Sequence, residues 1–222
     1  MFEVDGTDNV VTHPDNVVVN GSIKGRGNHV SIRSAHQPSV IRLHVNGNNN
    51  RIEIGDVYAI RELSIFCGNH ISANNTLLTI GDRFSIEPGS CIYLFNHGSI
   101  VSIGDDCLFS RDIVMRCGES PHLIFDTSTG DYLDRGKHLQ IGRHVWVGER
   151  VYFNKNAKVP DNVIVGACSV VTKRFAIENS VIAGNPARVA KQNVTWIRNV
   201  DFIPKGSVFE TGYNSYIADT GD

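Results

Sequence analysis

Large apolar side chains recur every six residues in this chain, and this spacing constrains its fold more than any other feature. From residue 141 the chain reads IGRHVW, VGERVY, FNKNAK, VPDNVI, VGACSV and VTKRFA, and the fifth place of each hexad is small or apolar. The first places of these hexads are Ile141, Val147, Phe153, Val159, Val165 and Val171. An α-helix needs apolar residues about 3.6 positions apart, and a half-buried strand needs alternation. A period of six instead predicts short strands separated by tight turns, stacked as a triangular parallel β-helix.

The same repeat is present in shorter pieces before residue 141. IGDRFS and IEPGSC begin at Ile80 and Ile86, and IGDDCL and FSRDIV begin at Ile103 and Phe109. Nearer the N-terminus, GRGNHVSI and NGNNNRIEIGD place Gly–Asn turns between short apolar segments. Gly and Asn tolerate left-handed backbone at tight corners, and stacked Asn side chains can form ladders between coils. We therefore predict one β-helix domain over residues 1–183.

Residues 184–222 are expected to form a C-terminal helix and a tail. The segment from Ala187 to Trp196 has modest helical character. A helix there would cover the open end of the solenoid, where strand edges are otherwise unpaired. The last residues, GSVFETGYNSYIADTGD, are rich in Gly and polar side chains and are expected to be a poorly fixed tail.

Composition narrows the classes of function. A formal net charge of −2 gives no electrostatic reason to expect nucleic acid or an anionic membrane as the main partner. The sequence has no apolar run suited to a transmembrane helix, and acidic residues stand where a signal peptide would be basic, so the cytoplasm is the expected compartment. The 5 cysteines are scattered without CxxC spacing, so we expect reduced thiols that fill small spaces, with no structural zinc site.

One loop, residues 117–138, interrupts the repeat. It reads CGESPHLIFDTSTGDYLDRGKH, so histidines, carboxylates and turn formers replace the aliphatic period. A purely structural solenoid would gain nothing from exposing such a polar segment. We therefore predict that this loop carries the function.

Three phrases, HVWVG (144–148), NVIVGACSVVTKRF (162–175) and NSVIAGNPARVAK (179–191), together with the hexads resemble the hexapeptide-repeat acyltransferases. In particular they resemble the branch that O-acetylates sugars of capsular, lipopolysaccharide or sialic-acid polymers. The resemblance implies an all-β fold: a left-handed parallel β-helix with a protruding catalytic loop and a short C-terminal helix. It also implies acetyl-CoA as co-substrate, a sugar or polysaccharide acceptor, and a homotrimer with active sites between subunits.

In that branch a loop carries an arginine, small or acidic residues, a histidine, and then an aliphatic–aromatic–aspartate phrase. Here it reads RCGESPHLIFD, and alignment on IFD places His122 at the catalytic histidine. A neutral histidine can take the proton of an acceptor hydroxyl and pass it to the leaving CoA thiolate. A carboxylate would orient its second ring nitrogen, with Glu119 as the first candidate and Asp126 as the second. One residue is inserted between acid and histidine relative to the family, which leaves this partner open.

The resemblance also implies a CoA site along the late coils, between two subunits. Small residues there would permit close approach of the pantetheine chain, a tryptophan would stack on CoA or a sugar, and cations would meet the phosphates. For each cation, a solvated basic side chain is an equal alternative. The expected cofactor-binding residues are Trp146, Gly148, Gly166, Ala167, Lys173, Arg188 and Lys191.

Other functions stay open at this point. One is an N-acetyltransferase of a nucleotide-linked amino sugar; another is a γ-type carbonic anhydrase-like zinc enzyme, which needs three histidines across a subunit interface. A third uses Cys117 as an acyl-enzyme nucleophile. His138 could line the acceptor cleft and His97 could approach a neighbouring subunit, whereas His144 is expected to be a surface turn residue. The acceptor could be a polymer, a lipid-linked repeat unit or a nucleotide sugar.

Overall fold

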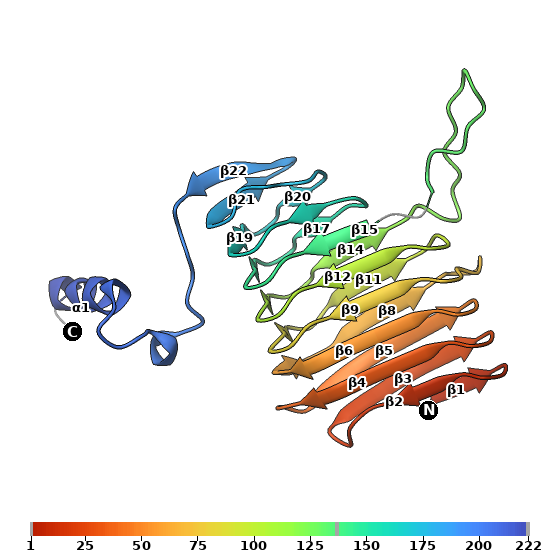
Figure 1. Cartoon of the computed structure of the whole chain (residues 1–222), viewed down its shortest axis with the longest axis horizontal. Coiled ribbons are helices and arrows are strands. Elements are labelled where there is room, and N and C mark those ends of the chain that lie inside the picture. Colours follow the sequence, from red (N-terminus) through yellow and green to blue (C-terminus); the bar gives the residue numbers. More distant parts are fainter. Residues whose placement is uncertain (1, 136–137, 221–222) are drawn as a thin grey trace.

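The protein forms a parallel β-helix with an arm and a C-terminal segment that leave it on different sides (Figure 1). The computed structural model describes residues 2–135 and 138–220, so residues 136–137 of the predicted loop and 221–222 of the predicted tail lie outside the described residues. Strands of successive coils pair in parallel and build three sheets, which we call A, B and C. The predicted fold class is confirmed.

The first two coils contribute strands to sheets A and B only, and from β5 to β19 successive strands follow the order A, B, C. Sheet A consists of β1 (Phe2–Asp5), β3 (Val17–Lys24), β5 (Ser39–Asn46), β8 (Leu63–Cys67), β11 (Ser90–Leu94), β14 (Val114–Cys117), β17 (Tyr152–Phe153) and β20 (Val170–Val171). Sheet B consists of β2 (Val10–Thr12), β4 (His29–Ala35), β6 (Arg51–Val57), β9 (Leu77–Ile80), β12 (Ile100–Ile103), β15 (His138–Ile141) and β18 (Lys158–Val159). Sheet C consists of β7 (Ala59–Ile60), β10 (Ser85–Ile86), β13 (Leu108–Phe109), β16 (Trp146–Val147), β19 (Val163–Val165), β21 (Ser180–Gly184) and β22 (Ala187–Gln192).

The hexads place one large side chain per face in a continuous core. The first residue of every hexad from 141 onward is buried there. Three positions later the backbone turns through the left-handed region, for example at His144 (φ 52°) and Asn162 (φ 57°). Glycine often follows the buried residue because coils meet closely at the corner: a Cβ on Gly142 would lie 2.4 Å from Asp161 Oδ1. The period of six therefore combines one core position with one tight corner.

An asparagine ladder stabilises the irregular N-terminal coils, as predicted. Asn28 Nδ2 donates to Asn9 Oδ1, Asn50 Nδ2 donates to Asn28 Oδ1, and Thr76 Oγ1 donates to Asn50 Oδ1, each at 2.9 Å. Asn28 and Asn50 are buried. Stacking from coil to coil satisfies these amides, which would otherwise cost free energy inside the solenoid.

The predicted helix from Ala187 to Trp196 is wrong. Residues Ala187–Gln192 form strand β22, which turns back and pairs antiparallel with β21. The open edge of β21 offers unpaired N–H and C=O groups, and pairing with them outweighs a modest helix propensity. β22 therefore continues sheet C past residue 183, the domain boundary that the sequence predicts.

The predicted loose tail is also wrong, because it contains the C-terminal helix. Helix α1 (Val208–Thr220) follows a short 3₁₀ turn, η1 (Val200–Phe202). Ser207 Oγ accepts from the Glu210 N–H at 3.2 Å, and Glu210 Oε2 accepts from the Gly206 N–H at 2.6 Å. This serine–glutamate pair begins the helix as a capping box does. Neither described helix is long and apolar enough to cross a membrane.

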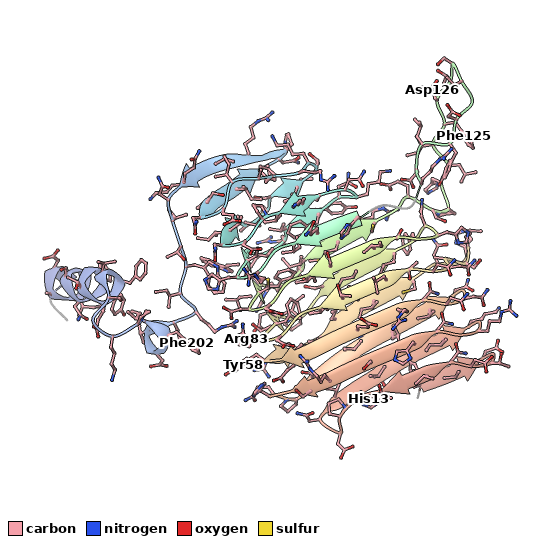
Figure 2. All side chains as sticks on the ribbon, viewed as in Figure 1. His13, Tyr58, Arg83, Phe125, Asp126 and Phe202 are labelled. Atoms are coloured by element: carbon pink, nitrogen blue, oxygen red, sulfur yellow. The ribbon has the colours of Figure 1, made fainter. Side chains whose placement is uncertain are left out.

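The segment between β22 and η1 packs along the corner between sheets B and C. Trp196 stacks on the His144 ring with centroids 4.2 Å apart, and its Nε1 donates to the His144 carbonyl at 3.0 Å. Arg198 donates to Ser85 Oγ at 2.8 Å and lies over the Tyr58 ring. Figure 2 labels Tyr58 beside this segment. His144 is thus a turn residue, as predicted, but one whose ring is covered by the C-terminal segment.

Candidate active site

The predicted loop forms an arm (residues 119–134) that projects from the corner between sheets A and B (Figure 1). It leaves after β14 of sheet A and returns to β15 of sheet B. Its two sides pair as a hairpin: Phe125 bridges to Tyr132, and the Leu133 N–H donates to the Ile124 carbonyl at 2.8 Å. Asp126 lies near the far end of the arm (Figure 2), where its carboxylate accepts from the Ser128 and Thr129 N–H groups.

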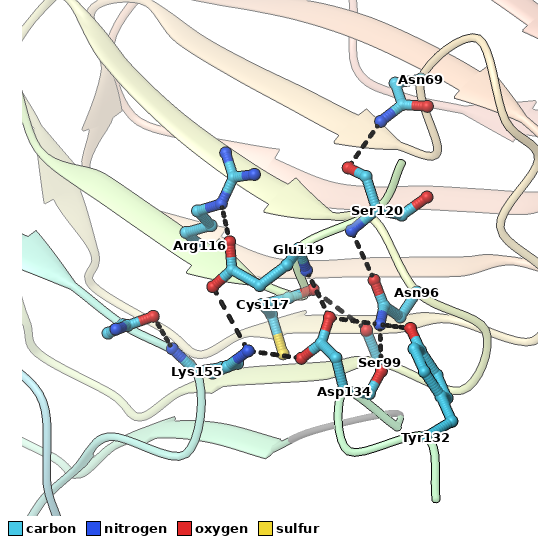
Figure 3. Close-up of polar contacts among 11 residues, drawn as sticks. Asn69, Asn96, Ser99, Arg116, Cys117, Glu119, Ser120, Tyr132, Asp134 and Lys155 are labelled. Carbon is cyan, nitrogen blue, oxygen red and sulfur yellow. Dashed lines mark hydrogen bonds and ion pairs between the residues drawn. The ribbon is translucent and has the colours of Figure 1, made fainter. Parts of the chain in front are cut away.

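A buried carboxylate anchors the base of the arm. Asp134 is 1% exposed and accepts from Lys155 Nζ at 2.5 Å, the Glu119 N–H at 2.7 Å and Asn96 Nδ2 at 2.8 Å (Figure 3). Asn96 Oδ1 in turn accepts from the Ser120 N–H at 3.1 Å. Both sides of the arm are therefore tied to the β-helix through one charged network.

Asp134 and Lys155 hold each other in their charged forms. Burial raises the pKa of Asp134, but hydrogen bonds from Lys155, Glu119 and Asn96 outweigh it, so the net pKa lies below the ordinary 3.8. Burial lowers the pKa of Lys155, yet the Asp134 and Glu119 carboxylates raise it more, so its pKa lies above 10.5. At neutral pH the base of the arm is held by a complete ion pair.

Glu119 belongs to this network. Its Oε2 accepts from Arg116 Nε at 2.9 Å, and its Oε1 lies 3.4 Å from Lys155 Nζ (Figure 3). Gly118 allows the chain to enter here, because its φ is +114° and a Cβ would lie 2.4 Å from Asn96 Oδ1. Within one chain the Glu119 carboxylate is thus engaged by two cations and is not brought to the His122 ring.

His122 lies exposed on the arm, just beyond this anchored base. Its N–H donates to the Glu119 carbonyl at 3.0 Å, which fixes the backbone at the turn. Over the ranges 2–135 and 138–220, no group hydrogen bonds to its ring. Leu123 (65% exposed) and Phe125 (50% exposed) follow it, so the arm presents apolar side chains together with the histidine.

The predicted cofactor residues lie mainly along sheet C and the corner that follows it. Trp146 and Gly148 lie on and just after β16, and Gly166 and Ala167 lie just after β19. The Trp146 side chain lies between Leu108 and Ile164 of the adjacent strands and is 38% exposed. Gly148 also has a structural reason to be glycine, since a Cβ would lie 2.7 Å from the Ala167 nitrogen.

The three predicted phosphate-binding cations do not gather in one place. Arg188 and Lys191 lie exposed on β22 of sheet C. Lys173 instead follows β20 of sheet A, where its amine lies over the Phe175 ring, 5.2 Å from the centroid. It is therefore on the side of the arm rather than on the side of Trp146.

The other predicted candidates have separate environments. Burial raises the pKa of the Cys117 thiol, as it raises that of Cys67 to about 11, which makes each a weak nucleophile. His138 lies on sheet B with Nε2 2.9 Å from Ser102 Oγ, and burial together with Arg174 and Lys158 lowers its pKa. His97 lies at the corner beside the arm, where its Nδ1 accepts from the Asn74 N–H at 3.0 Å. In the part of the chain that the structure describes, no three His, Cys, Asp or Glu side chains form a metal-binding group.

Comparison with known proteins adds to this geometry. No model of a protein family matches the chain. Over 98 residues, or 44% of this chain, it is 29% identical to the polysialic acid O-acetyltransferase of Escherichia coli O1:K1 / APEC, of whose length it spans 31%. The crystal structure of the polysialic acid O-acetyltransferase OatWY is 28% identical with a TM-score of 0.68, over 97% of this chain and 99% of OatWY. The chain is similar to the polysialic acid O-acetyltransferases.

The likeness confirms the resemblance to hexapeptide-repeat acyltransferases of the polysaccharide-modifying branch. The polySia-specific acetyltransferase NeuO, at 23% identity and a TM-score of 0.59 over 98% of each chain, shares the fold. The resemblance therefore rests on sequence and fold together.

Sequence reasoning did not find the network that holds the arm. Asp134, Lys155 and Asn96 lie in different coils, and their side chains follow no common period. Lys155 occupies the third place of an ordinary hexad, FNKNAK, where a solvated lysine would look the same. The one available signal was the charge-rich return of the loop, DYLDRG, and it does not say which acid is buried.

Proposed function

We propose that the chain is an O-acetyltransferase that moves an acetyl group from acetyl-CoA to a sugar hydroxyl of a polysaccharide or its precursor. The observation that carries the proposal is the position of His122, on an anchored arm that leaves the β-helix of a chain similar to OatWY over nearly its whole length. We propose the cytoplasm as its compartment, because acetyl-CoA is a cytoplasmic metabolite.

His122 would act as the general base. It takes the proton of the acceptor hydroxyl as that oxygen attacks the thioester carbonyl carbon, which contributes on the order of a hundred- to ten-thousand-fold in rate. The C–S bond then breaks, and His122 returns the proton to the thiolate of CoA. The sugar ester and free CoA are the products. No acyl-enzyme is needed, which agrees with the raised pKa of the buried Cys117 thiol.

Glu119 would act on His122 through the backbone. Its carboxylate binds Arg116 and Lys155, while its carbonyl accepts from the His122 N–H. We therefore assign Glu119 a positioning role rather than that of a carboxylate on the imidazole.

The site would be completed by a second copy of the chain. The arm projects from the corner between sheets A and B, and sheet C, which carries Trp146, is the face opposite that corner. One chain therefore cannot bring His122 to its own Trp146, whereas neighbouring copies in a trimer can bring them together. The exposed Phe125 side chain fits the same arrangement, because a neighbour would cover it.

Mixing two inactive variants tests whether His122 is needed for the reaction and whether the site is shared between subunits. His122→Ala and Trp146→Ala chains, co-expressed with different affinity tags, should regain about a quarter of wild-type turnover in random trimers, because some interfaces pair two intact residues. The measurement is release of free CoA with an acetyl-CoA and sialic-acid oligomer mixture, and the control is each variant alone. If the mixture stays as inactive as its parents while remaining trimeric, the shared site is wrong.

The acceptor class is tested separately. Wild-type protein should acetylate one of a polymer, a lipid-linked repeat unit or a nucleotide sugar, with NMR of the product identifying an ester on oxygen. An amide product would replace the proposal with N-acetyl transfer. Failure to bind acetyl-CoA would reject it altogether.

A further inference from the structure

A pocket lies beside the base of the arm. We call it the base pocket. It is enclosed by three successive corners between sheets A and B: the segment after β8, the segment after β11, and the arm. Its volume of about 310 Å³ is enough to hold one sugar unit. Ile71, Phe95 and Leu123 form its apolar lining, and His97, Tyr132 and Arg135 are among its polar lining.

Two polar side chains that line the base pocket, Arg135 and His97, can donate hydrogen bonds to a ligand. Asp134 and Asn96 also line it, but their side chains are used within the network at the arm base. Among the described residues, no carboxylate pairs with the Arg135 guanidinium, whose Nε donates to the Tyr132 carbonyl at 3.3 Å. A cation without a carboxylate partner, at the edge of a pocket whose own acid is already neutralised, favours an anionic ligand.

His97 adds a second donor, and its corner position shows why. Asn48 Oδ1 accepts from the Arg26 N–H, Asn74 Oδ1 accepts from the Asn48 N–H, and His97 Nδ1 accepts from the Asn74 N–H at 3.0 Å. His97 thus occupies the next position of an asparagine ladder. Because its Nδ1 is an acceptor there, its Nε2 must carry the hydrogen. An asparagine would serve the ladder equally well, so the ladder does not require the imidazole.

The base pocket is next to the proposed base. Ser120 and Leu123 both line it, and His122 lies between them in the chain. A sugar held in the pocket would therefore contact the same turn of the arm that carries His122.

We propose that the base pocket binds one carboxylate-bearing sugar unit of the acceptor, with Arg135 and His97 recognising the carboxylate and Phe95 and Leu123 packing against the sugar. This inference rests on the proposed function, because it assigns the acceptor side of the same site. Arg135 provides the planar pair of donors that matches a carboxylate.

Charge removal without loss of shape is the test. Arg135→Gln removes the cation, and His97→Asn keeps the ladder acceptor while removing the Nε2 donor. For oligosialic acid as acceptor, each should raise KM about 10- to 100-fold, as expected for a lost hydrogen bond to a charged group. The KM for acetyl-CoA should not change. Arg61→Gln, at an exposed arginine on the corner between sheets C and A, is the matched control and should behave as wild type.

A carboxyl-reduced oligosialic acid separates charge recognition from general damage. Wild type should prefer the acidic acceptor at least about tenfold, and Arg135→Gln should abolish that preference. Equal losses on both acceptors, or no loss on either, would overturn the assignment. Competition by UDP that is as strong as competition by free sialic acid would also overturn it, because the anion recognised would then be a phosphate.

Binding measured without acetyl-CoA distinguishes this inference from the proposed function. Saturation-transfer NMR should show sialic acid contacting wild-type protein and not Arg135→Gln. If the sugar binds in this way but no acetyl transfer occurs, the base pocket stands and the proposed reaction fails. If transfer to oligosialic acid occurs but neither pocket variant alters it, the reaction stands and the base pocket fails.

Discussion

Two corners of the same β-helix are used in opposite ways. At the corner between sheets B and C, the turns stay tight and the C-terminal segment covers them through Trp196 and Arg198. At the corner between sheets A and B, the chain instead inserts an arm and carries His122 out to the solvent. One corner is covered and the other is extended, although both flank the same sheet B.

The difference shows where a β-helix can accept change. Corner residues do not enter the core, so an insertion leaves the stacked apolar columns intact, and β14 and β15 keep their register with β11 and β12. The insertion still has to be held in place. Here a buried charge, Asp134, holds it, whereas the B–C corner is held by ring stacking and hydrogen bonds.

The largest expected effect is the loss of His122. His122→Ala should lower kcat by about a hundred- to ten-thousand-fold, because the acceptor hydroxyl then lacks its base. The side chain is exposed, so the free energy of unfolding should change by less than about 0.5 kcal/mol. Steady-state kinetics and thermal unfolding of the same preparation check both parts. A variant that keeps wild-type turnover would remove the arm from the chemistry.

Substitution in the β-helix core should have the opposite effect, a loss of stability. Phe153 is fully buried in β17, and Phe153→Ala should lower the free energy of unfolding by about 3–5 kcal/mol through lost contacts and the cavity left behind. Phe202→Ala, at a side chain that is 58% exposed, is the matched control and should be close to neutral. Chemical denaturation measures both. Similar losses for the two would mean that the stacked core does not dominate stability.

Asp134→Asn should release the arm while leaving the β-helix intact. Removing one partner of a buried ion pair costs about 3–5 kcal/mol. Here we expect that loss to appear as local opening of the arm base. A displacement of about 1 Å at His122 can lower kcat about a hundredfold. We expect faster amide exchange over residues 119–134, lower kcat and an unchanged KM for acetyl-CoA. Asp131→Asn, farther out on the arm, should leave all three as in wild type.

The Asp134–Lys155 ion pair defines the pH range over which the arm is held in place. The folded pKa of Asp134 is lowered, so its contribution is present above 3.8 and is lost as pH falls through the folded pKa. The folded pKa of Lys155 is raised, so its contribution is present below 10.5 and is lost as pH rises through the folded pKa. Arm protection in amide exchange should therefore be flat near neutrality. A transition between pH 6 and 8 would contradict this assignment of charges.

The β-helix could be predicted from the sequence because the same structural requirements recur along it. One core position and one corner recur in every hexad, so Ile141, Val147 and Phe153 could be placed from spacing alone. The arm could be located as an interruption, and His122 through a resemblance. Its anchor could not be found, because Lys155 and Asp134 are 21 residues apart and nothing periodic relates them.

The C-terminal errors have two different causes. β22 is a strand because the free edge of β21 lies beside it, and local propensity carries no information about that edge. Helix α1, by contrast, had a local signal. Ser207 three residues before Glu210 is a capping box, and the many polar residues around it concealed this start.

The smallest effect concerns the covered corner. Arg198 is mostly buried and donates to Ser85 Oγ at 2.8 Å and to Asp106 Oδ1 at 3.4 Å. Arg198→Ala should therefore lower the stability of this contact by about 1–2 kcal/mol. The loss should appear as detachment of residues 193–199 rather than as unfolding of the coils. In a Trp146→Phe background, Trp196 fluorescence should shift to the red as its ring leaves His144. An unshifted spectrum would mean that stacking on His144 alone holds the segment, and that the B–C corner needs no polar anchor of the kind that Asp134 gives the arm.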